Sequence, residues 1–162
     1  MKQRVTALIG QEAIHSKMHN EFNDVLAEHR FPVAFYRFLA EQVFEYGFKQ
    51  LPHRLQLSLM AGIEHFTAVI AEFFMKHEEI FFQTDDEKQR ALWMWHMLEE
   101  SEHKDIAYDV YQTLSGNYPL RVTGFAMAFF TILFLVPLGG ALIPVFRKPT
   151  QLLRRAYWKD VR

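Results

Sequence analysis

Residues 85–114 read DDEKQRALWMWHMLEESEHKDIAYDVYQTL, and this stretch decides the fold. No Gly or Pro interrupts it. Thr84 followed by Glu87 is the pattern of a helix-initiating capping box, and Gly116 is the residue type that favours a helix C-terminus. The sequence therefore predicts one long helix here.

The same pair of residues occurs on this helix and on a second one. The predicted helix over 85–114 carries Glu100-x-x-His103, and a helix predicted over residues 3–29 carries Glu12-x-x-His15. Residues three apart in a helix lie about 60° apart around its axis, so each pair presents a carboxylate and an imidazole on one face.

Two further helices are predicted between these two. Pro32 ends the first helix, and residues 33–50 and 52–82 then have helical patterns, the second of which carries Glu64. Two Glu-x-x-His helices and single Glu residues from two others form the di-iron or di-manganese site of ferritin-like proteins. The sequence therefore predicts an all-α, ferritin-like helical bundle.

The polar residues on these helices predict a metal site. Carboxylates and imidazoles are costly to bury unless they are paired or bind a metal. Glu72 lies on the same predicted helix as Glu64 and is a weaker candidate for the carboxylate ligand. Glu99 is the candidate catalytic residue, as a group that moves protons. The donors suit iron, manganese or zinc. The predicted metal ligands are Glu12, His15, His19, Glu64, His96, Glu100 and His103.

The C-terminal part of the chain has a different composition. Residues 122–146 contain no charged residue, and a helix of this length could span a hydrocarbon core of roughly 30 Å. Pro and Gly residues in its second half leave a straight span, a kinked span and a re-entrant hairpin open. We expect residues 1–118 to form the metal-binding bundle, and residues 119–162 to form a membrane segment with a basic tail on the cytoplasmic side.

The composition excludes several classes of protein. With 162 residues, of which 50% are apolar, the chain is long enough to bury a core. A net charge of −1 makes nucleic acid an unexpected partner, and the absence of Cys excludes thiolate metal sites. The chain has no nucleophile elbow, Walker loop or dinucleotide fingerprint.

Three motifs on these helices are specific in combination. They are Ile9-Gly10-Gln11-Glu12-Ala13-x-His15-x-x-x-His19-x-x-x-Asn23, Ala61-x-x-Glu64-His65-Phe66-Thr67-Ala68 and Trp93-x-Trp95-His96-x-x-Glu99-Glu100-x-Glu102-His103-Lys104. Together they resemble those of a bacterial family described as predicted metal-dependent hydrolases, a ferritin-like, membrane-associated group. The resemblance implies metal ligands at Glu12, His15, Glu64, Glu100 and His103.

The chain departs from this family in one respect. A ferritin-like site takes a Glu from a helix that precedes the first Glu-x-x-His helix, and this chain starts at the Glu-x-x-His helix itself. We expect an incomplete bundle whose first helix is missing, with its place in the site taken by water, by His19 or His96, or by a partner chain.

These observations predict a metal-dependent hydrolase with a mononuclear or dinuclear site. One alternative is a di-iron oxidase or oxygenase acting on a lipid-like substrate, and another is a non-catalytic membrane interaction protein derived from a truncated enzyme. The expected partners are a small-molecule or lipid-like substrate, the membrane, and a second copy or another chain that supplies the missing helix. The expected location is the bacterial inner membrane.

Overall fold

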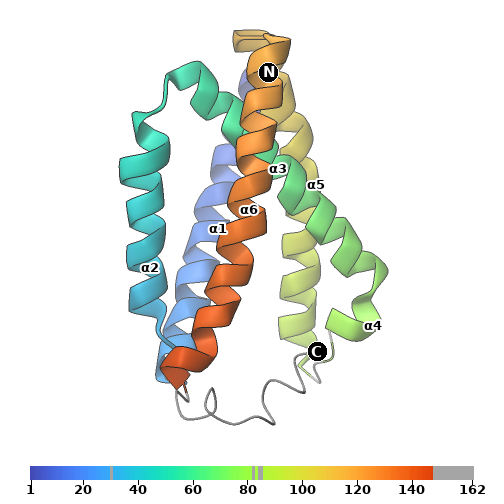
Figure 1. The fold of residues 1–162 in the computed structure, drawn as a ribbon. Coiled ribbons are helices and arrows are strands. Elements are labelled where there is room, and N and C mark those ends of the chain that lie inside the picture. Colours follow the sequence, from blue (N-terminus) through green and yellow to red (C-terminus); the bar gives the residue numbers. More distant parts are fainter. Residues whose placement is uncertain (30, 82, 84–85, 148–162) are drawn as a thin grey trace. The chain divides into compact units, whose positions relative to one another are not determined.

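The structure is a computed structural model that describes residues 1–29, 31–81, 83 and 86–147. Within these residues it is helical and has no strand, which confirms the all-α prediction. The ferritin-like assignment stays a prediction. The helices are α1 (Lys2–Glu28), α2 (Val33–Glu41), α3 (His53–Lys76), α4 (Glu78–Phe81), α5 (Glu87–Leu114) and α6 (Tyr118–Arg147), with a π-helical turn at Gln42–Gly47 and a 3₁₀ turn at Phe48–Gln50 (Figure 1).

The chain divides into two compact units. Unit 1 contains Met1–Ser16 and Leu51–Phe130, and unit 2 contains Lys17–Gln50 and the part of α6 from Thr131 onward. The helices α1 and α6 contribute to both units. The predicted division into residues 1–118 and 119–162 stays a prediction.

In unit 1, α3 and α5 pack against each other and run in opposite directions (Figure 1). Ala71 packs with Met97, and Glu64 lies beside His103, so residue numbers fall along α3 as they rise along α5. Small residues line the contact, because Ala68 and Ala71 are both buried. Their short side chains let the two helices approach closely.

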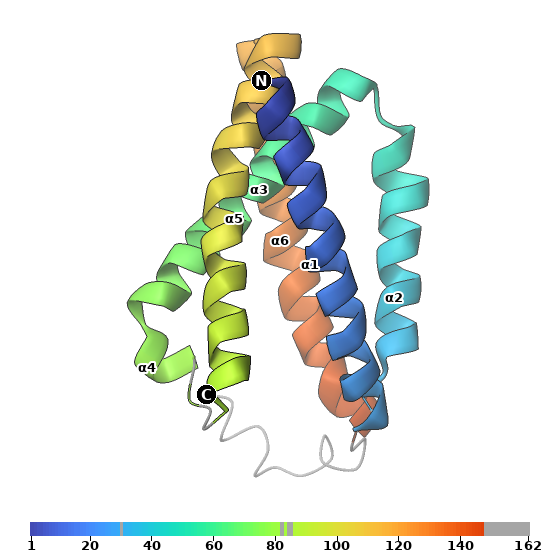
Figure 2. The same ribbon diagram turned by 180° about the vertical axis from the view of Figure 1, so that it is seen from behind.

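The first half of α1 also runs antiparallel to α5 (Figure 2). Arg4 forms an ion pair with Asp109, and Gln11 Nε2 donates a hydrogen bond of 3.1 Å to Glu102. In this part of unit 1, α1 and α3 therefore share a direction and α5 opposes both. A bundle with one long crossover connection has parallel neighbours of this kind.

The first half of α6 packs along α3 at close range. The Ser58 hydroxyl donates a hydrogen bond of 2.8 Å to the Leu120 carbonyl. A Cβ atom at Gly124 would overlap the Ser58 side chain, and one at Gly62 would lie 2.9 Å from the Ala128 Cβ. Residue numbers rise together along the two helices, so α3 and α6 are parallel.

The helix α6 is continuous from Tyr118 to Arg147, so of the three courses left open by the sequence the re-entrant hairpin does not form. In unit 2, the Tyr36 hydroxyl donates a hydrogen bond of 2.5 Å to the carbonyl of Gly139, within the Pro- and Gly-containing part of α6. Two helices, α3 and α6, are long and apolar enough to cross a membrane. A smaller share of α6 than of α3 is buried.

Helix ends differ from the predicted ones in the middle of the chain. The helix predicted over 52–82 ends at Lys76, because His77 leaves helical geometry with φ −124° and ψ 40°. The N-cap of α5 is Asp86, whose carboxylate accepts hydrogen bonds from the amides of Lys88 and Gln89. The predicted capping residue, Thr84, and the basic tail beyond Arg147 lie outside the described residues. Gly116 has φ +62°, as a glycine after a helix C-terminus requires.

Candidate metal centre

Three helices of unit 1 bring Glu12, Glu64 and His103 together. The Nδ1 atom of His103 lies 3.0 Å from a carboxylate oxygen of Glu12 and 3.7 Å from one of Glu64. Their ligand atoms all lie within 4.8 Å of one another. His103 is fully buried, and the side chain of Glu64 is 15% exposed.

This group could hold one cation. Metal–ligand bonds of about 2.0–2.2 Å place two ligands of the same ion roughly 3–4 Å apart. The buried ring nitrogens of His103 make no hydrogen bond within the described residues. A buried polar group without a hydrogen bond is costly, and a cation held by Nδ1 would offset that cost for this atom. The residues present therefore fit a divalent metal.

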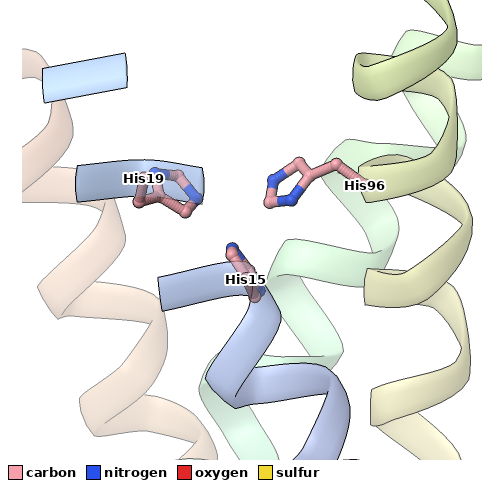
Figure 3. Close-up of side chains that lie close together, drawn as sticks. All are labelled: His15, His19 and His96. Atoms are coloured by element: carbon pink, nitrogen blue, oxygen red, sulfur yellow. The ribbon is translucent and has the colours of Figure 1, made fainter. Parts of the chain in front are cut away.

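A second group of donors adjoins the first. In His15, Nδ1 lies 3.7 Å from a carboxylate oxygen of Glu100, and in His96, Nε2 lies 4.0 Å from the same oxygen. The rings of His15 and His96 meet edge to face with centroids 4.4 Å apart (Figure 3). The His15 and His103 rings are 6.5 Å apart, so the two groups are neighbours.

The two Glu-x-x-His pairs are interlocked. Glu12 of α1 meets His103 of α5, and Glu100 of α5 meets His15 of α1. This crosswise arrangement follows from the antiparallel course of the two helices, because advancing three residues on one helix moves back along the other. The sequence predicted that each pair lies on one face of its helix, but it did not predict which carboxylate meets which imidazole.

Glu99 is a buried carboxylate beside these groups. It is 2% exposed, and neither of its oxygens makes a hydrogen bond within the described residues. Burial, followed by the nearby charges of Glu12, Glu100 and Glu102, raises the pKa of Glu99 to about 7. A carboxyl group with such a pKa can both accept and release a proton near neutral pH.

His19 and Glu72 are the two other residues that the sequence analysis considered as ligands. His19 follows His15 by one turn of α1 and belongs to unit 2, so its part in the site stays a prediction (Figure 3). Glu72, the weak competitor of Glu64, forms an ion pair of 2.6 Å with Lys76 on the surface of α3. It is already neutralised there, which leaves Glu64 as the carboxylate that α3 contributes.

Comparison with known proteins supports a metal-binding function. A family model described as "Predicted metal-dependent hydrolase" matches residues 1–162. No curated protein and no solved structure matches the chain. The family name implies a divalent metal, and the donor groups of α1, α3 and α5 are candidates to hold it. By the match over its full length, the chain belongs to the family of predicted metal-dependent hydrolases.

Proposed function

We propose that the chain is a metal-dependent hydrolase whose centre holds two ions in adjacent subsites. The observation that carries this proposal is the interlocking of the two Glu-x-x-His pairs. The carboxylate subsite consists of Glu12, Glu64 and His103, and the histidine subsite consists of His15, His96 and Glu100. Two neighbouring subsites of this kind suit a dinuclear centre better than a single ion.

In hydrolysis, some of these residues would bind the ions and Glu99 would transfer a proton. A divalent ion bound there would lower the pKa of a water molecule and polarise the oxygen of a carbonyl or phosphoryl group. The carboxylates of Glu12, Glu64 and Glu100 would neutralise the ions, and the imidazoles would fix their positions. Glu99 would take the proton from the attacking water and return it to the leaving group, because it is a buried carboxylate next to Glu100 in the chain.

The donors admit iron, manganese or zinc. If iron occupies the centre, the same ligands suit dioxygen activation, which would make the protein an oxidase or oxygenase of a lipid-like substrate. The exposed apolar side chains in the first half of α6, such as Phe129, belong to the same unit as the site and favour a lipid-like substrate for either reaction. We take hydrolysis as the primary proposal because the family description names it.

We further propose that α6 anchors the protein in a bacterial inner membrane. Its outward-facing side chains include Phe130, Phe134 and Val136, which are 53%, 63% and 65% exposed. A contiguous apolar surface of this kind is unfavourable in water and favourable in lipid. The basic tail on the cytoplasmic side, and a second chain that completes the site, belong to the same proposal.

Metal analysis tests the site directly. Elemental analysis of the purified full-length protein should find iron, manganese or zinc at one or two ions per chain. The double variant His15→Ala with His103→Ala should lose them. The control, His29→Ala with His53→Ala, removes two exposed imidazoles and should keep the metal. A metal-free wild type that is folded by circular dichroism would favour the non-catalytic alternative and overturn the enzyme proposal.

The class of reaction is tested with the metal-loaded protein. Hydrolysis predicts turnover of ester or phosphoester substrates under strictly anaerobic conditions, with loss of turnover in Glu99→Gln while metal content is kept. Consumption of dioxygen together with inactivity in its absence would instead select the oxidase or oxygenase alternative.

A further inference from the structure

A pocket lies in unit 1, between α5, the first turns of α6 and the first half of α3. Its volume is about 240 Å³. None of its lining residues is a proposed metal ligand. The lining residues are Ser58, Ala61, Gly62, His65, Tyr108, Tyr118, Arg121, Val122 and Phe125.

One wall of this pocket is apolar. Ala61 and Gly62 of α3 face Val122 and Phe125 of α6, and the Phe125 ring lies 5.5 Å from the ring of His65. Gly62 contributes no side chain to the pocket and lies where α3 and α6 approach each other closely. Drug-sized molecules take pockets of about 300–1,000 Å³, so this one has room for the first part of an apolar chain.

Arg121 is the one cationic side chain that lines the pocket. Its guanidinium donates a hydrogen bond of 2.8 Å to the Tyr108 hydroxyl, and it lies 4.9 Å from the centre of the Tyr118 ring and 5.6 Å from that of Tyr108. These contacts hold the guanidinium in place. Within the part of the chain that the structure describes, no carboxylate lies within ion-pair distance of it.

The polar groups at Arg121 are suited to an anion. A guanidinium has five N–H donors, and one hydrogen bond to Tyr108 leaves most of them available. The Tyr108 hydroxyl accepts from Arg121 and can donate its own proton to the same anion. Carboxylate and phosphate groups match the fork of donors on a guanidinium.

We infer that this pocket binds an anionic amphiphile, a molecule with a carboxylate or phosphate head and an apolar chain. The head binds Arg121 and the Tyr108 hydroxyl. The chain lies against Ala61, Val122 and Phe125. The inference stands apart from the proposed hydrolase activity, because it uses none of the metal-site residues.

A fluorescent fatty acid tests the inference. Dansyl-labelled undecanoate and its uncharged methyl ester are titrated into the full-length protein in zwitterionic lipid nanodiscs, with dansyl fluorescence as the readout. We expect saturable binding of the acid at one molecule per chain, about tenfold weaker in Arg121→Gln and only partly restored in Arg121→Lys, which keeps the charge but lacks the fork of donors. The matched control is Arg54→Gln, which removes an exposed cation from the same unit and should bind as the wild type does.

Two further measurements separate the alternatives. Ala61→Phe fills the apolar part of the pocket and should weaken binding with Arg121 intact. Decyl phosphate should displace the probe at concentrations at which inorganic phosphate does not. Equal binding of acid and ester, unchanged binding in both Arg121→Gln and Ala61→Phe, or equal competition by inorganic phosphate would each overturn the inference.

Discussion

The buried carboxylates and imidazoles of unit 1 stabilise the fold only if something neutralises them. Glu64, Glu99, Glu100 and His103 are all largely or fully shielded from water. Removing a carboxylate from water costs several kcal/mol unless a cation or several donors compensate it. Without a bound cation, these residues should therefore destabilise the folded protein.

Because of Glu99, the unfolding free energy of the metal-free protein should depend on pH. The pKa of Glu99 is about 7 in the folded protein and near 4.5 in the unfolded chain, so the folded state holds its proton more tightly. The stabilising contribution of protonated Glu99 is present below pH 4.5 and is lost as the pH rises through 7. We expect the metal-free protein to lose on the order of 2–3 kcal/mol of unfolding free energy between pH 5 and pH 8 from this group.

Urea unfolding of chelator-treated protein at several pH values measures this loss. Glu99→Gln should remove this part of the pH dependence, because an amide does not titrate. A slope should remain from Glu64, because burial and the charges of Glu100 and Glu12 raise its pKa to about 7 as well. Glu21→Gln, which changes an exposed carboxylate on α1, serves as the control. A wild-type profile that is already flat, or one that Glu99→Gln leaves unchanged, would contradict the assignment of the pH dependence to Glu99.

The ligand residues could be predicted from the sequence, but their pairing could not. The spacing of Glu12 and His15 on one helix, and of Glu100 and His103 on another, shows the residue types that share a face. Which carboxylate meets which imidazole depends on the relative direction and register of two helices. Those are fixed by packing between segments about ninety residues apart, which helical periodicity does not encode.

At the scale of elements, the contact between α3 and α6 has little tolerance for larger side chains. A Cβ atom at Gly124 would overlap Ser58, which is itself buried and bonded to the Leu120 carbonyl. We expect Gly124→Ala to destabilise the protein by about 1–3 kcal/mol, as overpacking does. Thermal unfolding measures the effect.

The matched control for this substitution is Gly10→Ala on α1. A Cβ atom there meets nothing within 4 Å, and alanine favours helix over glycine by roughly 0.5–1 kcal/mol. This variant should therefore be slightly more stable than the wild type. Equal thermal stability of Gly124→Ala and Gly10→Ala would show that α3 and α6 do not approach each other as closely as in the structure.

The apolar surface of α6 predicts membrane insertion. Each Arg at the centre of a spanning helix costs about 2.5–3.5 kcal/mol on insertion scales. We expect Leu133→Arg with Phe134→Arg to move the protein out of the carbonate-resistant membrane fraction. Leu114→Arg, at an exposed apolar position of α5, should leave the distribution unchanged. Wild-type protein extracted completely by carbonate would refute the membrane proposal.

Prediction from the sequence succeeded for helices and failed at several of their ends. The patterns around residues 3–29 and 85–114 gave α1 and α5 to within two residues at each end. The pattern over 33–50 did not show that the α-helix changes to a π-helical turn after Glu41, because apolar spacing tolerates one inserted residue. For α6, Pro137 left several backbone courses open, and the sequence alone could not select the continuous helix that forms.

At the scale of the whole molecule, the proposed metal ligands, except His19, belong to one compact unit. That unit combines Met1–Ser16 with Leu51–Phe130, so metal binding joins two segments that are separated in the chain. A ligand that binds only the folded state at one hundred times its dissociation constant stabilises that state by about 2.7 kcal/mol. For a chain of this size we expect the metal to raise Tm by roughly 5–10 °C.

Thermal scans with and without added manganese, iron or zinc measure this shift. The variant His15→Ala with His103→Ala should show none of it, while His29→Ala with His53→Ala should show all of it. A metal-independent Tm in the wild type would mean that the donors of α1, α3 and α5 are satisfied without a cation.

The close approach of Gly124 to Ser58 has an evolutionary consequence. A side chain at position 124 would overlap both the side chain and the backbone carbonyl carbon of Ser58, although the two positions lie far apart in the gene. A smaller residue at position 58 would therefore not make room for it, and related chains should keep glycine at position 124.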